Sequence, residues 1–99
     1  MINTVNELGE IELSKGVFKD IVSLIVSKNT NFKSDKKDNS YIKVLTDNDK
    51  ISIYVYLKAK KDIDVVRLSN KLQKEIKEAV VSTTNVTIDN ININVEGFF

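Results

Sequence analysis

The side chains that could carry chemistry are limited in kind, because the chain contains neither histidine nor cysteine. Without histidine it lacks the usual general acid or base near neutral pH and the commonest metal ligand. Without cysteine it has no thiolate nucleophile, no Cys-ligated metal centre and no disulfide, which suits a reducing compartment. We therefore expect no enzymatic activity, no bound metal and no cofactor.

Carboxylates are the remaining candidates for catalysis. Asp35, Asp38, Asp47 and Asp49 lie in polar stretches rich in turn-forming residues. In such stretches an aspartate side chain accepts hydrogen bonds from nearby backbone amides. The alternation of Asp47 and Asp49 resembles part of a calcium loop, but the glycine and the distal glutamate of such a loop are missing. We interpret these carboxylates as solvated turn residues.

Two tyrosines raise a different possibility. Tyr54 and Tyr56 are two residues apart in an alternating stretch, so both rings share one face of a predicted strand. Aromatic pairs on a central strand stack bases in the RNA-recognition motif. An RNA-binding module is therefore one alternative function. Its candidate surface consists of Tyr54, Tyr56, Lys58, Lys60 and Lys61.

The overall charge does not favour that alternative. The formal net charge of the chain is only +1, so there is no global attraction for nucleic acid or an anionic membrane. The glycine-containing signature around the aromatic residues of the RNA-recognition motif is also missing. We expect ordinary cross-strand packing or a protein interface for the tyrosines, and no nucleic-acid partner.

Two elements must position the tyrosines and lysines. Over residues 51–57 aliphatic side chains alternate with Ser52, Tyr54 and Tyr56, which predicts a strand. After Asp62 apolar residues recur every three or four positions, which predicts an amphipathic helix capped by Asp62 or Asp64. The apolar positions of that helix are Val65, Leu68, Leu72, Ile76 and Val80.

Further strands are predicted over residues 9–13, 41–45 and 85–96, with a hairpin turn over 47–50. A helix is predicted over residues 15–28, with Ser14 as its N-cap. The last strand changes parity between Ile88 and Ile91, so we expect a bulge at Asp89 and Asn90. The fold class is then α+β, with element order β-α-β-β-α-β. Two helices cover one face of a mainly antiparallel four-stranded sheet in a two-layer sandwich.

The length of 99 residues fits a single domain spanning residues 1–99. We expect residues 1–8 to be a loose lead-in and residues 32–40 to be a flexible loop. No apolar run reaches the 18 or so residues that span a bilayer, and the start does not read as a signal peptide. These features predict a cytoplasmic protein without a membrane span.

Some apolar side chains exceed what one small core requires. The helix over 15–28 is apolar over much of its circumference, and the chain ends in Phe98 and Phe99. The two phenylalanines either tuck under the sheet or dock on a neighbouring subunit. We expect a homo-oligomer. The candidate protein interface consists of Val17, Phe18, Val22, Phe98 and Phe99.

The pattern as a whole resembles the alkaline shock protein family of low-GC Gram-positive and related bacteria. Four segments carry the resemblance: residues 9–14 leading into Val17 and Ile21, the strand 51–57, residues 62–80, and the closing stretch 86–95. The family usually has Gly-Val after its first helix and Tyr-Gly before its second. This chain has residues 29–32 and 59–61 there instead, which suggests a divergent, short member.

The resemblance implies a non-enzymatic protein of cell-envelope homeostasis or stress that self-associates and acts as a scaffold. Relatives are often held near the membrane by a separate integral partner, so a membrane-anchored protein partner is expected. Some relatives are linked to fatty-acid synthesis, which adds a further alternative, a regulatory partner of a lipid-synthesis enzyme. The family has no known catalytic residues, so none are assigned here.

Overall fold

The computed structural model describes the backbone of residues 7–99 and the side chains of residues 15–99. Two long helices and four strands make up most of this part of the chain. In chain order the elements are α1 (Glu7–Lys28), β1 (Phe32–Lys33), the 3-10 helix η2 (Asn39–Tyr41), β2 (Ile42–Asp47), β3 (Lys50–Ala59), α2 (Val65–Thr84) and β4 (Asn90–Phe98).

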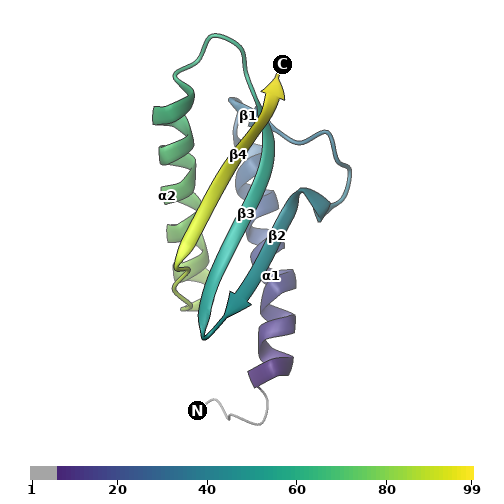
Figure 1. The fold of residues 1–99 in the computed structure, drawn as a ribbon, viewed down its shortest axis with the longest axis vertical. Helices are drawn as coiled ribbons and strands as arrows, with labels where there is room; N and C mark the ends of the chain where they lie inside the picture. Colours follow the sequence, from purple (N-terminus) through teal and green to yellow (C-terminus); the bar gives the residue numbers. More distant parts are fainter. Residues whose placement is uncertain (1–6) are drawn as a thin grey trace.

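The elements form two layers, with α1 and α2 lying together behind one face of the sheet (Figure 1). Within residues 7–99, no helix lies over the other face of the sheet. This confirms the predicted α+β class and the two-layer arrangement. The predicted element order is wrong at its start, because α1 is the first described element and the two-residue β1 follows it.

The predicted strand over residues 9–13 is helical backbone, and Ser14 lies inside α1 instead of capping it. A five-residue alternation is too short to exclude a helix, and Ile11 stands seven residues before Phe18, which is two helical turns. Of the predicted lead-in, residues 7 and 8 belong to α1, and residues 1–6 lie outside the described residues. The N-terminal turns of α1 extend past the end of the sheet (Figure 1).

β3 is the central strand of the sheet. β2 and β1 pair with it antiparallel along one edge, β2 with residues 50–55 and β1 with Lys58 and Ala59. β4 pairs with the other edge and runs parallel to β3. The parallel pairing follows from α2, which carries the chain back along the sheet before β4 begins. Two of the three pairings are antiparallel, as the predicted class requires.

The predicted hairpin is confirmed. Asp47 pairs with Lys50, and the two residues between them, Asn48 and Asp49, have φ angles of 50° and 68°. Positive φ at both central positions is the geometry of a type I′ turn, which asparagine and aspartate tolerate better than most residues. The turn fixes the register in which β2 meets β3.

The core lies between the helices and the covered face of β3. Each helix contributes one stripe of apolar side chains. β3 contributes the aliphatic side chains of its alternating sequence. The largest fully buried side chains of these elements are Phe18, Val22, Leu72, Ile76, Val80, Ile53, Val55 and Leu57. At the start of α2, the Asp64 carboxylate accepts the backbone N–H of Arg67 at 3.2 Å. Of the two predicted caps, Asp62 and Asp64, Asp64 is therefore the one that caps the helix.

The last strand differs from its prediction. It begins at Asn90, because residues 85–89 form a connection in which Ile88 is fully buried. The expected bulge at Asp89 and Asn90 is wrong. The register shift lies instead between the pair Leu57–Val95 and the pair Lys58–Gly97, which leaves Glu96 as the extra residue. Asp89 has another role, since its carboxylate accepts the backbone N–H of Ile51 at 2.7 Å.

Candidate binding surfaces

The uncovered face of the sheet brings the two tyrosines together with residues from both neighbouring strands. Tyr54 pairs with Lys43 on β2 and with Asn92 on β4, and Tyr56 pairs with Asn94. Both tyrosines are half-buried. The Lys43 ammonium lies 5.8 Å from the centre of the Tyr56 ring, within the range of a cation–π contact. We call these five residues the open face.

Lys58 lies near the C-terminal end of β3, two residues beyond Tyr56, and forms an ion pair with Asp35. The hydrogen bond from Lys58 lowers the pKa of the Asp35 carboxyl, and the same bond raises the pKa of Lys58. Both groups are exposed to solvent, so the pair adds little to stability. Lys58 is thus partly neutralised as a nucleic-acid contact.

The other two lysines of the candidate nucleic-acid surface follow β3. Lys60 and Lys61 have exposed side chains, while their backbone N–H groups donate to the carbonyls of Asn31 and Phe99 at 2.7 and 2.9 Å. Their backbone is therefore fixed and their ammonium groups are in solvent. The structure places both lysines just beyond the strand that carries the tyrosines.

The segment predicted as a flexible loop is held by several local bonds. Phe32 is buried, and β1 pairs with β3. Further along, the Asp38 carboxylate accepts the N–H of Ser40 at 3.0 Å and caps η2. Bonds to Ser40 lower the pKa of Asp38. The predicted mobility of the segment stays a prediction.

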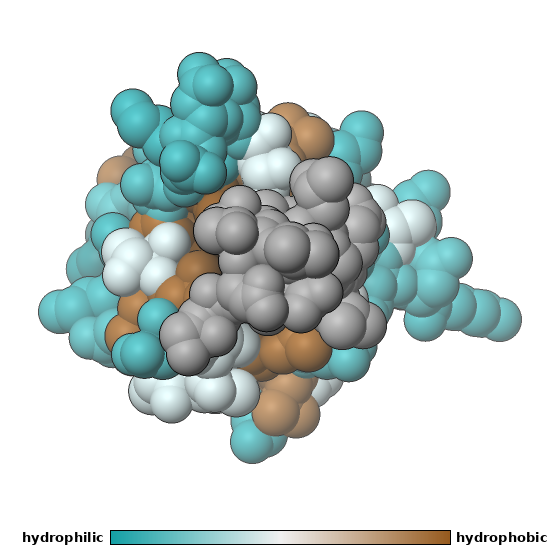
Figure 2. All heavy atoms as spheres, turned by 90° about the horizontal axis from the view of Figure 1, so that it is seen from below, coloured by the Kyte–Doolittle hydropathy of each residue, from teal (hydrophilic) through white to brown (hydrophobic). Residues whose placement is uncertain are grey.

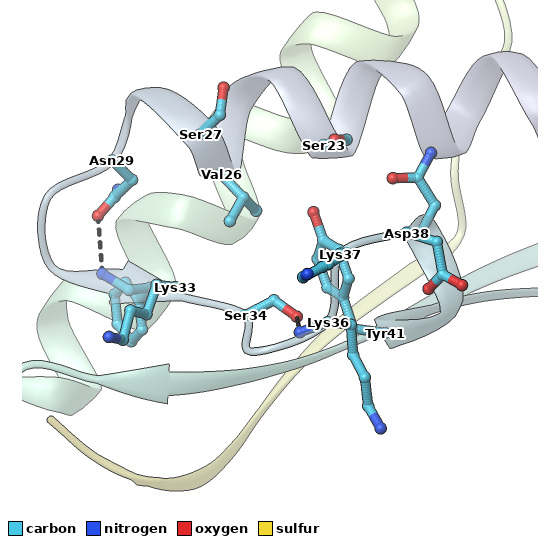
Figure 3. A pocket seen from close by; sticks show the side chains of 12 residues that line it. Ser23, Val26, Ser27, Asn29, Lys33, Ser34, Lys36, Lys37, Asp38 and Tyr41 are labelled. Atoms are coloured by element: carbon cyan, nitrogen blue, oxygen red, sulfur yellow. Dashed lines mark hydrogen bonds between the residues drawn. The ribbon is translucent and has the colours of Figure 1, made fainter.

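A shallow hollow of about 250 Å³ lies between this segment and the last turns of α1 (Figure 3). Ser23, Val26 and Ser27 line it from α1, and Tyr41 closes it from the sheet side. Phe32, three lysines and small polar side chains make up the rest of its wall. The Asn29 carboxamide oxygen is occupied by the N–H groups of Asn31 and Phe32, at 2.7 and 3.2 Å. The hollow is open to solvent, and its polar groups largely serve the turn itself.

The candidate protein interface divides into two groups. Phe18 and Val22 are 1% and 0% exposed, so the structure places them in the core of this chain. Val17 is 42% exposed on the outer side of α1, and Leu24, seven residues later, is 54% exposed. The seven-residue spacing of Val17 and Leu24 is the sequence signal that would have added Leu24 to the candidates.

The two C-terminal phenylalanines are not tucked under the sheet. Phe98 is 57% exposed and Phe99 37% exposed. The backbone of Phe99 continues the parallel ladder, since its N–H donates to the Ala59 carbonyl at 2.9 Å. The Lys33 ammonium lies 4.5 Å from the centre of the Phe99 ring, a contact that the sequence did not suggest.

The end of the molecule beside the hairpin turn also exposes hydrophobic side chains (Figure 2). Leu45 near the end of β2 is 55% exposed, and Val81 near the end of α2 is 38% exposed. Among the described residues, none of the helices is long and apolar enough to cross a membrane. The apolar surface is thus spread over several small areas.

Comparison with known proteins identifies no relative: no protein-family model, no curated protein and no solved structure matches the chain.

Proposed function

We propose that this protein is a non-enzymatic scaffold that acts by self-association and by docking to a protein partner. The observation that carries the proposal is that this small fold leaves large apolar side chains exposed on α1 and at the end of β4. Phe98 and Leu24 are each more than half exposed, although each is large enough to serve in a core. Contact with another protein surface would remove these side chains from water.

A role in cell-envelope homeostasis or stress, close to the membrane through an anchored partner, is the form of this proposal that the family resemblance favours. Three of the four segments that carry the resemblance fall on β3, on α2 with its cap, and on β4 with the connection before it. The fourth, residues 9–14, lies in α1. The part of the fold from β3 to β4 therefore carries most of the likeness.

Light scattering of the purified protein over a range of concentrations and salt tests self-association. We expect a defined oligomer that persists at high salt, because an apolar interface is not screened by ions. The double variant Phe98→Ser, Phe99→Ser should weaken it. Leu45→Ser, Val81→Ser is the matched control at the opposite end of the sheet. A monomer at every concentration would contradict the proposal.

A second candidate function is binding of single-stranded RNA on the open face. It is favoured by the position of Tyr54 and Tyr56 side by side on the uncovered face, with Lys43 beside them. Half-buried tyrosines present a ring face on which a base can stack.

Fluorescence anisotropy with a labelled single-stranded RNA at low salt tests this second candidate. RNA binding requires an affinity that falls steeply as salt is raised and that drops on Tyr54→Ala or Tyr56→Ala. Tyr41→Phe is a suitable control, because Tyr41 is buried and its ring is kept. The absence of a complex at low salt would exclude the RNA reading.

A further inference from the structure

β4 forms one edge of the sheet and pairs with β3 (Figure 1). Within residues 7–99 no other strand pairs with its outer edge, so a row of backbone N–H and C=O groups faces outward. Edge strands of soluble proteins commonly carry a lysine, a proline or a bulge that prevents pairing with another chain. Residues 90–95, Asn-Ile-Asn-Ile-Asn-Val, contain no charge and no proline, and the register shift comes after them.

The two faces of this strand are differently covered. Ile91, Ile93 and Val95 pack against the core on the helix side, but they are only half-buried because no element of residues 7–99 extends beyond them at the edge. Asn92 and Asn94 are exposed on the open face. The edge therefore combines unpaired backbone groups with an apolar row that the rest of the described chain leaves incompletely covered.

We propose that β4 pairs antiparallel with β4 of a second copy about a twofold axis at Ile93, which joins the two sheets into one. This proposal rests on the self-association proposed above and names its surface. In this register Ile93 lies opposite Ile93 of the second copy, and Ile91 lies opposite Val95. Asn92 lies opposite Asn94 on the other face.

A second copy fits this edge because the pattern is the same in both directions. Apolar side chains meet apolar ones, asparagines meet asparagines, and no like charges face each other within residues 90–95. A shift by one residue would place Asn92 opposite Val95 and turn the helices of the second copy to the other face of the sheet. The pairing is isologous, so it closes as a dimer and does not continue as a fibre.

Charges placed at positions 92 and 94 test the surface and its register together. Asn92→Lys with Asn94→Lys places lysines opposite each other, and we expect the dimer dissociation constant in light scattering to rise about tenfold. Asn92→Lys with Asn94→Glu places a lysine opposite a glutamate at both pairs. That variant should keep a dissociation constant close to that of the unmodified chain.

Both positions are exposed, so circular dichroism should show an unchanged fold in each variant. Thr30→Lys with Thr83→Lys adds the same charge at two exposed positions outside β4 and serves as the control. If the protein dimerises but the two-lysine variant dimerises equally well, the β4 pairing is refuted and self-association stands. If the lysine–glutamate variant is weakened as much as the two-lysine variant, the register is refuted. A monomeric unmodified chain contradicts both proposals.

Discussion

β3 and β4 have nearly the same alternation in sequence but very different surroundings. In β3 the core-side residues Ile53 and Val55 are fully buried. In β4 the equivalent residues Ile91 and Ile93, which pair with Ile53 and Val55, are only half-buried. The difference comes from the place of each strand in the sheet, because among the described strands β3 has neighbours on both edges and β4 on one. Alternation thus shows which side of a strand faces the core, and leaves open how completely that side is covered.

The largest expected effect comes from the core of the central strand. Ile53→Ala should lower the free energy of unfolding by about 2–5 kcal/mol, because it leaves a cavity in the closely packed core. Ile93→Ala should cost less than half as much, since a half-buried side chain loses less contact and solvent can fill the gap. Urea denaturation, at concentrations where both variants are monomeric, measures the two values. Equal losses would show that the edge strand is as tightly packed as the central one.

A smaller effect is expected where the connection before β4 meets the start of β3. The Asp89 carboxylate accepts the Ile51 N–H at 2.7 Å, and the Asp89 N–H donates to the Ile51 carbonyl at 2.9 Å. Asp89→Ala removes the first bond and should lower the free energy of unfolding by about 1 kcal/mol. Asp89→Asn keeps an acceptor and should recover most of that loss. If Asp89→Asn is as unstable as Asp89→Ala, the hydrogen bond is not what matters at this position.

The smallest effect concerns the ion pair of Asp35 with Lys58, at the end of β3 flanked by both β1 and β4. Because its pKa is lowered in the folded chain, Asp35 stabilises the fold above the ordinary pKa of aspartate, and this contribution is lost as pH falls through the lowered value. Lys58, whose pKa is raised, stabilises the fold below the ordinary pKa of lysine and loses that effect as pH rises through the raised value.

Asp35→Asn should remove the acid part of this dependence and change stability little at neutral pH, since both groups are exposed. Thermal unfolding followed from neutral to acidic pH compares the two proteins. An NMR titration should place the pKa of Asp35 below the ordinary aspartate value. A normal pKa for Asp35 would show that the pair does not persist in solution.

Sustained periodicity made much of the fold predictable. α2 repeats its apolar spacing from Val65 to Val80, and the buried members are Leu72, Ile76 and Val80. β3 and the hairpin were predictable for a similar reason, because β3 alternates regularly and is preceded by turn residues that accept positive φ. The face that carries Tyr54 and Tyr56 follows directly from that alternation.

The first and the last of the predicted strands, over residues 9–13 and 85–96, were less predictable, for different physical reasons. The short alternation over residues 9–13 fits either a strand or part of a helix, so the sequence could not decide where α1 begins. On α1 itself apolar residues surround much of the axis. Only tertiary packing places Phe18 and Val22 inside and leaves Val17 exposed.

β4 shows a further limit, since its parallel pairing and its place at the edge depend on how α2 packs. The parity change that pointed to a bulge at Asp89 is instead absorbed by the connection in which Ile88 is buried. No residue of β4 taken alone indicates that one edge of the strand has no partner strand in the part of the chain that the structure describes.

A single-cysteine cross-link tests the pairing of β4 most directly, because the chain has no cysteine of its own. Opposite residues of an antiparallel pair have Cα atoms about 4.5–5.5 Å apart, which a disulfide can bridge. Ile93→Cys at the twofold axis should therefore give a covalent dimer under mild oxidation, detected by non-reducing electrophoresis. Leu45→Cys, exposed on β2, should remain monomeric. A monomeric Ile93→Cys chain, or equal cross-linking at both positions, would contradict the proposed interface.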